Sequence, residues 1–187
     1  MLEVARTNRF KKGSGLPVFV PVIDMIEIGA GGGSIARVDP LGLLKVGPES
    51  AGAEPGPACY GKGGKLPTVT DANLILGYLD PRYFLGGTMS LDKAAALDAI
   101  ADLSKSLGLS QIATASGIYD LVCENMAAAA RVHIVETGRD PRGYAMVAMG
   151  GAGPLHAAAV AEKLGIKEII IPAASGTASA LGFLGSP

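Results

Sequence analysis

The chain has 187 residues, of which 49% are hydrophobic, and its 16 Lys and Arg nearly balance its 17 Asp and Glu, for a formal net charge of -1. This size and composition predict a single domain with a sizeable core. The charges are scattered and no stretch approaches the ~20 apolar residues that span a bilayer, so we expect neither a nucleic-acid nor a membrane partner.

Cysteine and histidine usage narrows the class further. Cys59 and Cys123 form neither a disulfide framework nor a Cys-x-x-Cys metal spacing, and the first residues lack the apolar core of a secretory signal. His133 has no second His or carboxylate pair that would complete a metal set, so we expect it to be a partly buried side chain of a helix. These patterns favour a cytoplasmic protein whose own side chains hold no metal.

Strand patterns dominate the start of the chain. Apolar runs predict strands over 18–20, 22–28, 34–38 and 43–46, and a turn at 39–42 joins the last two into a β-hairpin. A glycine cluster, 29–34 (GAGGGS), lies between the second and third runs, so we expect it to connect two antiparallel strands. The Gly-, Pro- and Ala-rich segment 48–65 should be an ordered but irregular loop.

Three helices are expected next. Asp71 should cap a helix over 72–79, and Ser90 should cap a second one that ends near Gly108. A long helix is predicted over 110–137, closed by Gly138. The expected apolar faces of the second and third helices consist of Ala94, Leu97, Ile100 and Leu103, and of Ile118, Leu121, Val122, Met126, Ala129, Val132 and Val135.

The last part of the chain predicts a βαβ unit. A strand over 144–149 is followed by a second glycine cluster, 150–153 (GGAG), a helix over 155–164 and a strand over 168–172. The fold class is therefore α/β. Because 175–182 begins another turn and helix, we expect 1–187 to be a single partial domain that is cut at its C-terminal end. We expect 1–13 to be poorly ordered or the incomplete start of a chain truncated at both ends.

Both glycine clusters are candidate nucleotide loops, because glycine lets backbone N–H groups approach a phosphate or an adenine ring closely. In the first cluster the candidates for the phosphate end of ATP are Gly31, Gly32, Gly33 and Ser34; in the second, the candidates for the adenosine are Gly150, Gly151 and Gly153. The alternatives are a tight turn in the first and close strand-to-helix packing in the second. A dinucleotide fingerprint fits poorly, since Ser34 occupies its third glycine position and the next segment reads as a strand.

Four other residues are weighed as site candidates. His156, in the first turn of a helix, should be neutral, and either touches the nucleotide or is a packed structural residue. Cys59 is expected to be buried and inert. Asp24 and Glu27 lie on opposite faces of an expected strand, so at most one of them can face a catalytic centre.

Four stretches resemble the ATP-dependent hydantoinase A / 5-oxoprolinase family, which includes acetone and acetophenone carboxylase subunits. They are 23–36 (IDMIEIGAGGGSIA), 46–61 (VGPESAGAEPGPACYG), 68–73 (TVTDAN) and 150–157 (GGAGPLHA), and the likeness runs from about Ser14 to Leu184. The resemblance implies the second lobe of an actin-like ATPase fold, shared with sugar kinases and heat-shock chaperones, with a mixed sheet, a β-hairpin and flanking helices. ATP and Mg²⁺ would lie in a cleft between two lobes.

The resemblance also implies a reaction. A family member of this kind phosphorylates a lactam carbonyl with ATP before hydrolytic ring opening, and works with a hydantoinase B-type partner subunit or domain. Alternatives are an ATP-dependent ketone carboxylase subunit, a kinase-like phosphotransferase, or a non-catalytic nucleotide-binding lobe. By family position Asp24 is the one catalytic candidate, whereas Ile26 stands where many members have His. The segment 86–92 (GGTMSLD) resembles a phosphate loop, but we interpret it as a helix start.

Overall fold

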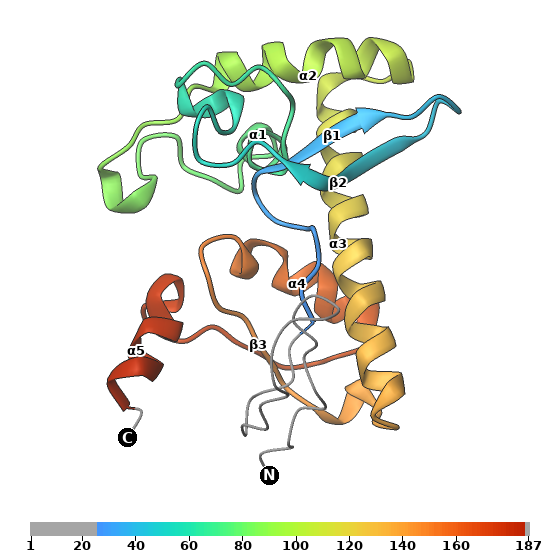
Figure 1. Ribbon diagram of the computed structural model, residues 1–187, viewed down its shortest axis with the longest axis vertical. Helices are drawn as coiled ribbons and strands as arrows, with labels where there is room; N and C mark the ends of the chain where they lie inside the picture. The colour runs from blue at the N-terminus through green and yellow to red at the C-terminus, as the bar shows by residue number, and fades with distance from the viewer. Residues whose placement is uncertain (1–25, 186–187) are drawn as a thin grey trace, which may run out of the picture.

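A long central helix organises the molecule. The computed structural model describes residues 26–185, and in Figure 1 the helix α3 (Gln111–Glu136) runs beside two groups of elements. Along its N-terminal half lie β1 (Ser34–Val38), β2 (Leu44–Ser50), α1 (Val69–Ile75) and α2 (Lys93–Leu107). Along its C-terminal half lie β3 (Met146–Val147), α4 (Gly153–Leu164) and β4 (Ile169–Ile170), and α5 (Ala178–Gly185) follows.

The β-hairpin is confirmed. β1 pairs antiparallel with β2, and Asp39 Oδ1 closes the turn by accepting hydrogen bonds from Leu41 N and Leu43 N, both at 2.9 Å. The strand expected directly before the first glycine cluster is wrong for 26–28, where Ile26 and Ile28 are half-exposed. The expectations for 1–13, 18–20 and 22–25 lie outside the described residues. The cluster therefore leads into β1 from an irregular segment and does not join two strands.

All three expected helices are present, with two different caps. α1 begins three residues early, because Thr68 is its N-cap: Thr68 Oγ1 accepts from Asp71 N at 3.3 Å and the Asp71 carboxylate accepts from Thr68 N at 3.0 Å. Asp71 is thus the third residue of the helix and closes the capping box, and its assignment as the cap is wrong. α2 is capped by Asp92, not Ser90, and ends at Gly108 as expected. α3 has the predicted ends, with Ser110 as its cap.

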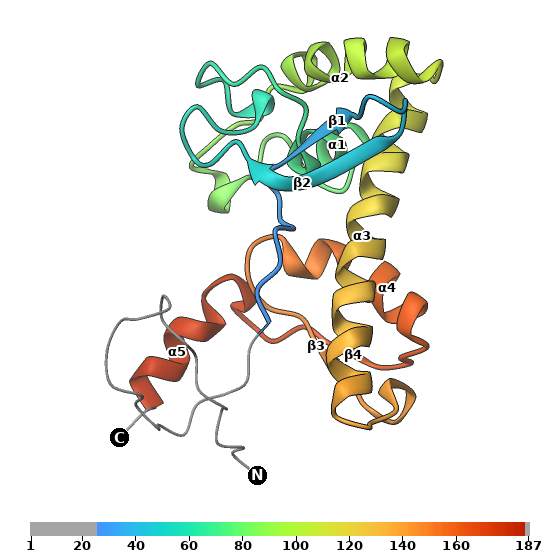
Figure 2. The ribbon, with the colours of Figure 1, turned by 45° about the vertical axis from the view of Figure 1, so that its right-hand side comes forward.

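The core lies where α1, α2 and the hairpin pack against α3. Its completely buried members include Val69, Ala72, Ala96, Ile100 and Ile118. Three residues expected on apolar faces are instead exposed, namely Ala94 on α2 and Val132 and Val135 on α3. The two valines lie near the end of α3, where the β3–α4–β4 unit covers one side of the helix (Figure 2).

The βαβ unit is confirmed with shorter strands. β3 and β4 are parallel, with Met146 opposite Ile169 and Val147 opposite Ile170, and α4 connects them. In the described part of the chain the strands form two separate two-stranded sheets, one antiparallel and one parallel, where the resemblance implied one mixed sheet. The short helices η1 (Ala58–Tyr60), η2 (Leu85–Gly87), η3 (Pro141–Gly143) and η4 (Ser175–Thr177) complete the α/β fold. None of the helices within 26–185 is long and apolar enough to cross a membrane.

Candidate functional site

The two glycine clusters lie beside each other. A Cβ atom on Gly32 would lie 3.9 Å from the Cβ of Ala152, so the first glycine loop (29–34) adjoins the second glycine loop (150–153). The first loop is also fixed to α1, because Thr70 N and Thr70 Oγ1 both donate to Gly32 O at 2.8 Å. The N-termini of α1 and α4 and both glycine loops therefore meet in one place, although Gly32 and Ala152 are 120 residues apart in sequence (152 against 32).

Most of the first glycine loop is packed against neighbouring backbone and side chains. A Cβ on Gly29 would lie 2.6 Å from Pro48 Cβ, and one on Gly32 or Gly33 would lie 2.7 Å from a hydroxyl oxygen, whereas Gly31 faces open space. Ser34 is 4% exposed and its Oγ accepts from Gly31 N at 3.0 Å. Close packing accounts for Gly29, Gly32 and Gly33, which favours the tight-turn alternative. Gly31 is the one glycine of the loop at which a Cβ would meet no neighbouring atom.

The second glycine loop is open. A side chain on Gly150, Gly151 or Gly153 would meet no other atom within 4 Å, and Gly150 has a left-handed φ of +87°. The loop opens α4, a 12-residue helix whose N-cap, Ala152, has no side-chain hydrogen bond to the helix. A helix N-terminus without a side-chain cap presents N–H groups and the positive end of the helix dipole, which together favour an anion.

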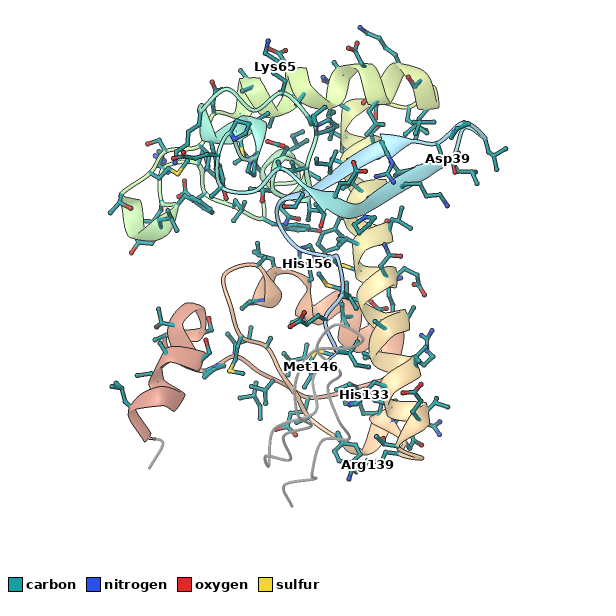
Figure 3. The ribbon with its side chains drawn as sticks, viewed as in Figure 1. Asp39, Lys65, His133, Arg139, Met146 and His156 are labelled. Carbon is teal, nitrogen blue, oxygen red and sulfur yellow. The ribbon has the colours of Figure 1, made fainter. Side chains whose placement is uncertain are left out.

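His156 lies directly behind the second glycine loop, in the first turn of α4 (Figure 3). Its ring is 1% exposed; Nε2 lies 3.3 Å from Asn73 Nδ2, and Nδ1 lies 3.4 Å from Cys123 Sγ. The ring of Tyr119 stacks on it at a centroid distance of 5.1 Å, and Tyr119 Oη donates to Leu155 O at 3.1 Å. Burial lowers the pKa of His156, so the ring is neutral as expected. These contacts with Asn73, Cys123 and Tyr119 favour a structural role for His156 as a packed side chain. Contact of His156 with a nucleotide stays a prediction.

Asp71 and Cys59 belong to the scaffold of the site. The Asp71 carboxylate is fully buried and accepts from Ala58 N, Cys59 N and Thr68 N, and from Thr68 Oγ1 at 2.8 Å. It thereby ties the irregular segment 48–65 to the start of α1. Cys59 is completely buried, as predicted, and burial raises the pKa of its thiol far above the ordinary value. Such a thiol is not a nucleophile at neutral pH.

Two of the remaining candidates, Glu27 and His133, do not join this cluster. Asp24 lies outside the described residues, Glu27 is exposed, and His133 is half-buried in the C-terminal half of α3, away from His156 in Figure 3. Within 26–185 no three His, Cys, Asp or Glu side chains are grouped as a metal site. A hollow of about 560 Å³ lies beside the hairpin, and residues such as Arg37 and Lys45 line it, but neither glycine loop does.

Sequence reasoning missed the residues that link the loops. Thr70 and Asn73 occur in the TVTDAN stretch, and Tyr119 lies on the long helix, yet none was singled out as a site residue. No local signal marks Asn73 in the sequence, because Thr70 and Asp71 of the same short helix are polar too. Asn73 is 1% exposed, and a residue of this type is rarely buried without a specific partner.

Comparison with known proteins agrees with this architecture. The family model described as Hydantoinase/oxoprolinase matches residues 2–186. An uncharacterized protein of Methanocaldococcus jannaschii is 51% identical over 177 residues, and caprolactamase subunit alpha of Pseudomonas jessenii is 47% identical over 180 residues. Each match covers 95% of this chain and 26% of the relative, so the chain spans about a quarter of the length of these curated relatives.

Two solved structures are also similar. Nucleotide-free acetone carboxylase, from a study of ATP-dependent acetone carboxylation, superposes with a TM-score of 0.81 at 36% identity, covering 89% of this chain and 24% of that one. The ATP-dependent caprolactamase of Pseudomonas jessenii superposes with a TM-score of 0.79 at 48% identity, covering 87% and 24%. Because the family model matches nearly the whole length of the chain, the chain belongs to the hydantoinase/oxoprolinase family.

Proposed function

We propose that the chain supplies one side of the ATP site of an ATP-dependent cyclic-amide hydrolase, in the second lobe of an actin-like ATPase fold. The observation that carries the proposal is the second glycine loop: three glycines that face open space at the N-terminus of a 12-residue helix without a side-chain cap. The N–H of Gly150 donates to Ser175 O at 2.9 Å, so the N–H groups of Gly151 and Gly153 are the ones that can approach a phosphate or the adenosine without steric hindrance. Gly31 of the first loop faces the same kind of open space.

The reaction follows from the chemistry of a lactam. Its carbonyl carbon is a poor electrophile, so the carbonyl oxygen attacks the γ-phosphorus of ATP and ADP leaves. Water then adds to the activated carbon and the C–N bond of the ring breaks as the nitrogen takes up a proton, which leaves an acyl phosphate. A second water molecule hydrolyses the acyl phosphate, giving inorganic phosphate and an amino acid. Such a transfer depends on positioning and on neutralising phosphate charge. Mg²⁺ would arrive bound to the nucleotide phosphates; the described residues form no metal cluster of their own.

The substrate class rests on relatives of two kinds. Caprolactamase, whose name denotes a cyclic amide as its substrate, favours lactam hydrolysis, whereas the likeness to acetone carboxylase favours phosphorylation of an enolisable ketone before carboxylation. Product analysis separates these reactions, and also separates both from a kinase that releases a stable phosphorylated product. Because the caprolactamase and carboxylase relatives are named as subunits, we also propose that the protein works with a hydantoinase B-type partner. We further propose that both act in the cytoplasm.

Calorimetric titration of the chain with ATP, ADP and NAD tests the binding claim. We expect weak binding of ATP and ADP and weaker or undetectable binding of NAD. Tighter binding of NAD would overturn the proposal in favour of a dinucleotide site.

The reaction claim needs the neighbouring parts of the relative. A caprolactamase subunit alpha in which this chain replaces the matching segment should release phosphate in a lactam-dependent manner when its partner subunit is present. The 187 residues alone should not turn over, since in-line transfer fails when groups are misplaced by about 1 Å. Lactam-dependent phosphate release by the chain alone, at the rate of the chimaera, would refute the proposal that catalytic groups outside this chain are required.

A further inference from the structure

Asn73 and His156 connect α1, which holds the first glycine loop, to α4, which follows the second. Asn73 lies one turn after Thr70, which holds the first glycine loop through Gly32 O, and His156 lies one turn after Gly153, the last residue of the second loop. Their side chains meet at 3.3 Å, and both residues are 1% exposed. The contact is therefore a direct polar link between α1 and α4 through the interior of the molecule, and it joins the two loops indirectly.

The link determines which ring nitrogen of His156 carries the proton. A neutral imidazole has one N–H donor and one acceptor nitrogen. An amide N–H₂ group can only donate, so the approach of Asn73 Nδ2 to Nε2 assigns the acceptor role to Nε2 and the proton to Nδ1, which lies 3.4 Å from Cys123 Sγ. Tyr119 covers a face of the ring and also binds the backbone of α4 through Leu155 O. Both edges of the imidazole and one face are thus fixed.

Asn73 also carries an unsatisfied group. Its Oδ1 is the one buried side-chain oxygen or nitrogen in the described part of the chain that lacks a hydrogen-bond partner. An apolar residue at this position would avoid the cost of burying an unpaired acceptor. Among the described residues, His156 is therefore the one hydrogen-bond partner of the Asn73 side chain.

We propose that Asn73 is a positioning residue for the nucleotide site: by holding His156 as the Nδ1–H tautomer it fixes the first turn of α4, and with it the second glycine loop, against α1. The inference rests on the proposed function, because the second loop is taken to bind the nucleotide. Asn73 itself is buried one turn behind the loop and is not assigned contact with the ligand.

The test exploits the histidine content of the chain. Only His133 and His156 are present, so ¹⁵N-histidine labelling gives two rings, and a His133→Gln variant assigns them. Near neutral pH the wild-type His156 should show a protonated Nδ1 and an unprotonated Nε2. In Asn73→Asp the carboxylate can only accept, so Nε2 should become protonated. A wild-type ring with its proton on Nε2 would overturn the proposal at once.

ATP affinity, measured by calorimetry, is the second readout. Asn73→Asp should weaken ATP binding by at least about tenfold, a readily measured change. Asn125→Asp is the matched control: it makes the same substitution at an exposed position of α3 and adds the same charge, so its affinity should stay within about twofold of wild type. A switched tautomer in Asn73→Asp with unchanged ATP affinity would refute the positioning role.

Two further measurements keep the outcomes distinct. If Asn73→Asp does not fold, Asn73→Ala, which adds no charge, takes its place in the same comparison. If the wild-type chain binds no ATP, the proposed function fails. The backbone amide signals of Gly151 and Gly153 then test separately whether Asn73 positions the second glycine loop. Displacement of those signals in the Asn73 variant, with none in Asn125→Asp, supports the positioning role, and unmoved signals overturn it.

Discussion

Replacing Gly151 with leucine separates a ligand-binding role of the second glycine loop from a packing role. Gly151 is exposed, its φ lies outside the left-handed region, and a Cβ there would meet no atom of the protein within 4 Å. The substitution should therefore change the free energy of unfolding by no more than about 0.5 kcal/mol. The added side chain instead fills the space that a nucleotide would need, so ADP affinity should fall at least about tenfold, or ~1.4 kcal/mol.

Calorimetry with ADP and thermal unfolding followed by circular dichroism measure the two effects. The control is Gly143→Leu, because Gly143 is also exposed, also outside the left-handed region and also without neighbours of its Cβ, but it lies in η3, before β3. That variant should match the wild type in both assays. If Gly151→Leu binds ADP as tightly as Gly143→Leu, the second glycine loop is not the nucleotide contact and the reasoning fails.

Three other predictions concern the scaffold. Gly32→Ala places a methyl group 2.7 Å from Thr70 Oγ1 and should lower the free energy of unfolding in urea by about 1–3 kcal/mol; a loss below about 0.5 kcal/mol would show that the contact relaxes freely. Asp71→Ala leaves three backbone N–H groups without their acceptor and should cost about 3 kcal/mol or more by the same assay, and near-wild-type stability would contradict the assigned network. Because burial raises the pKa of Cys59 and of Cys123, both thiols stay protonated below that raised pKa and should resist iodoacetamide near neutral pH until the chain unfolds. Rapid labelling of the native chain, read by mass spectrometry, would show that these side chains open to solvent.

Elements defined by local patterns were predictable from the sequence. The hairpin follows from alternating residues around an Asp-Pro-Leu-Gly turn, and Asp39 indeed accepts the hydrogen bonds that close it. The long helix follows from its apolar period and from Ser110 at its start. The start of α1 was misplaced although the signal was present, since Thr68 and Asp71 have the spacing of a capping box.

The site was only partly predictable, because glycine has two uses that look identical in a sequence. Gly32 and Gly151 both occur in short glycine-rich clusters, yet a Cβ on Gly32 would clash with Thr70 and one on Gly151 would enter open space. The partners that distinguish them are distant in sequence, as are Asn73 and His156, which are 83 residues apart. No local period reports such a contact, so the link between the loops becomes visible in the fold alone.

Titration of the ¹⁵N-labelled chain with Mg²⁺–ADP, followed through its backbone amide signals, tests the central claim most directly. The account predicts that the largest shifts occur at Gly31, Gly151 and Gly153, the glycines of the two loops that face open space without a left-handed φ. Gly143, equally open but remote in the fold, should not move. Saturable shifts centred away from both glycine loops would contradict the claim that these loops form the nucleotide site.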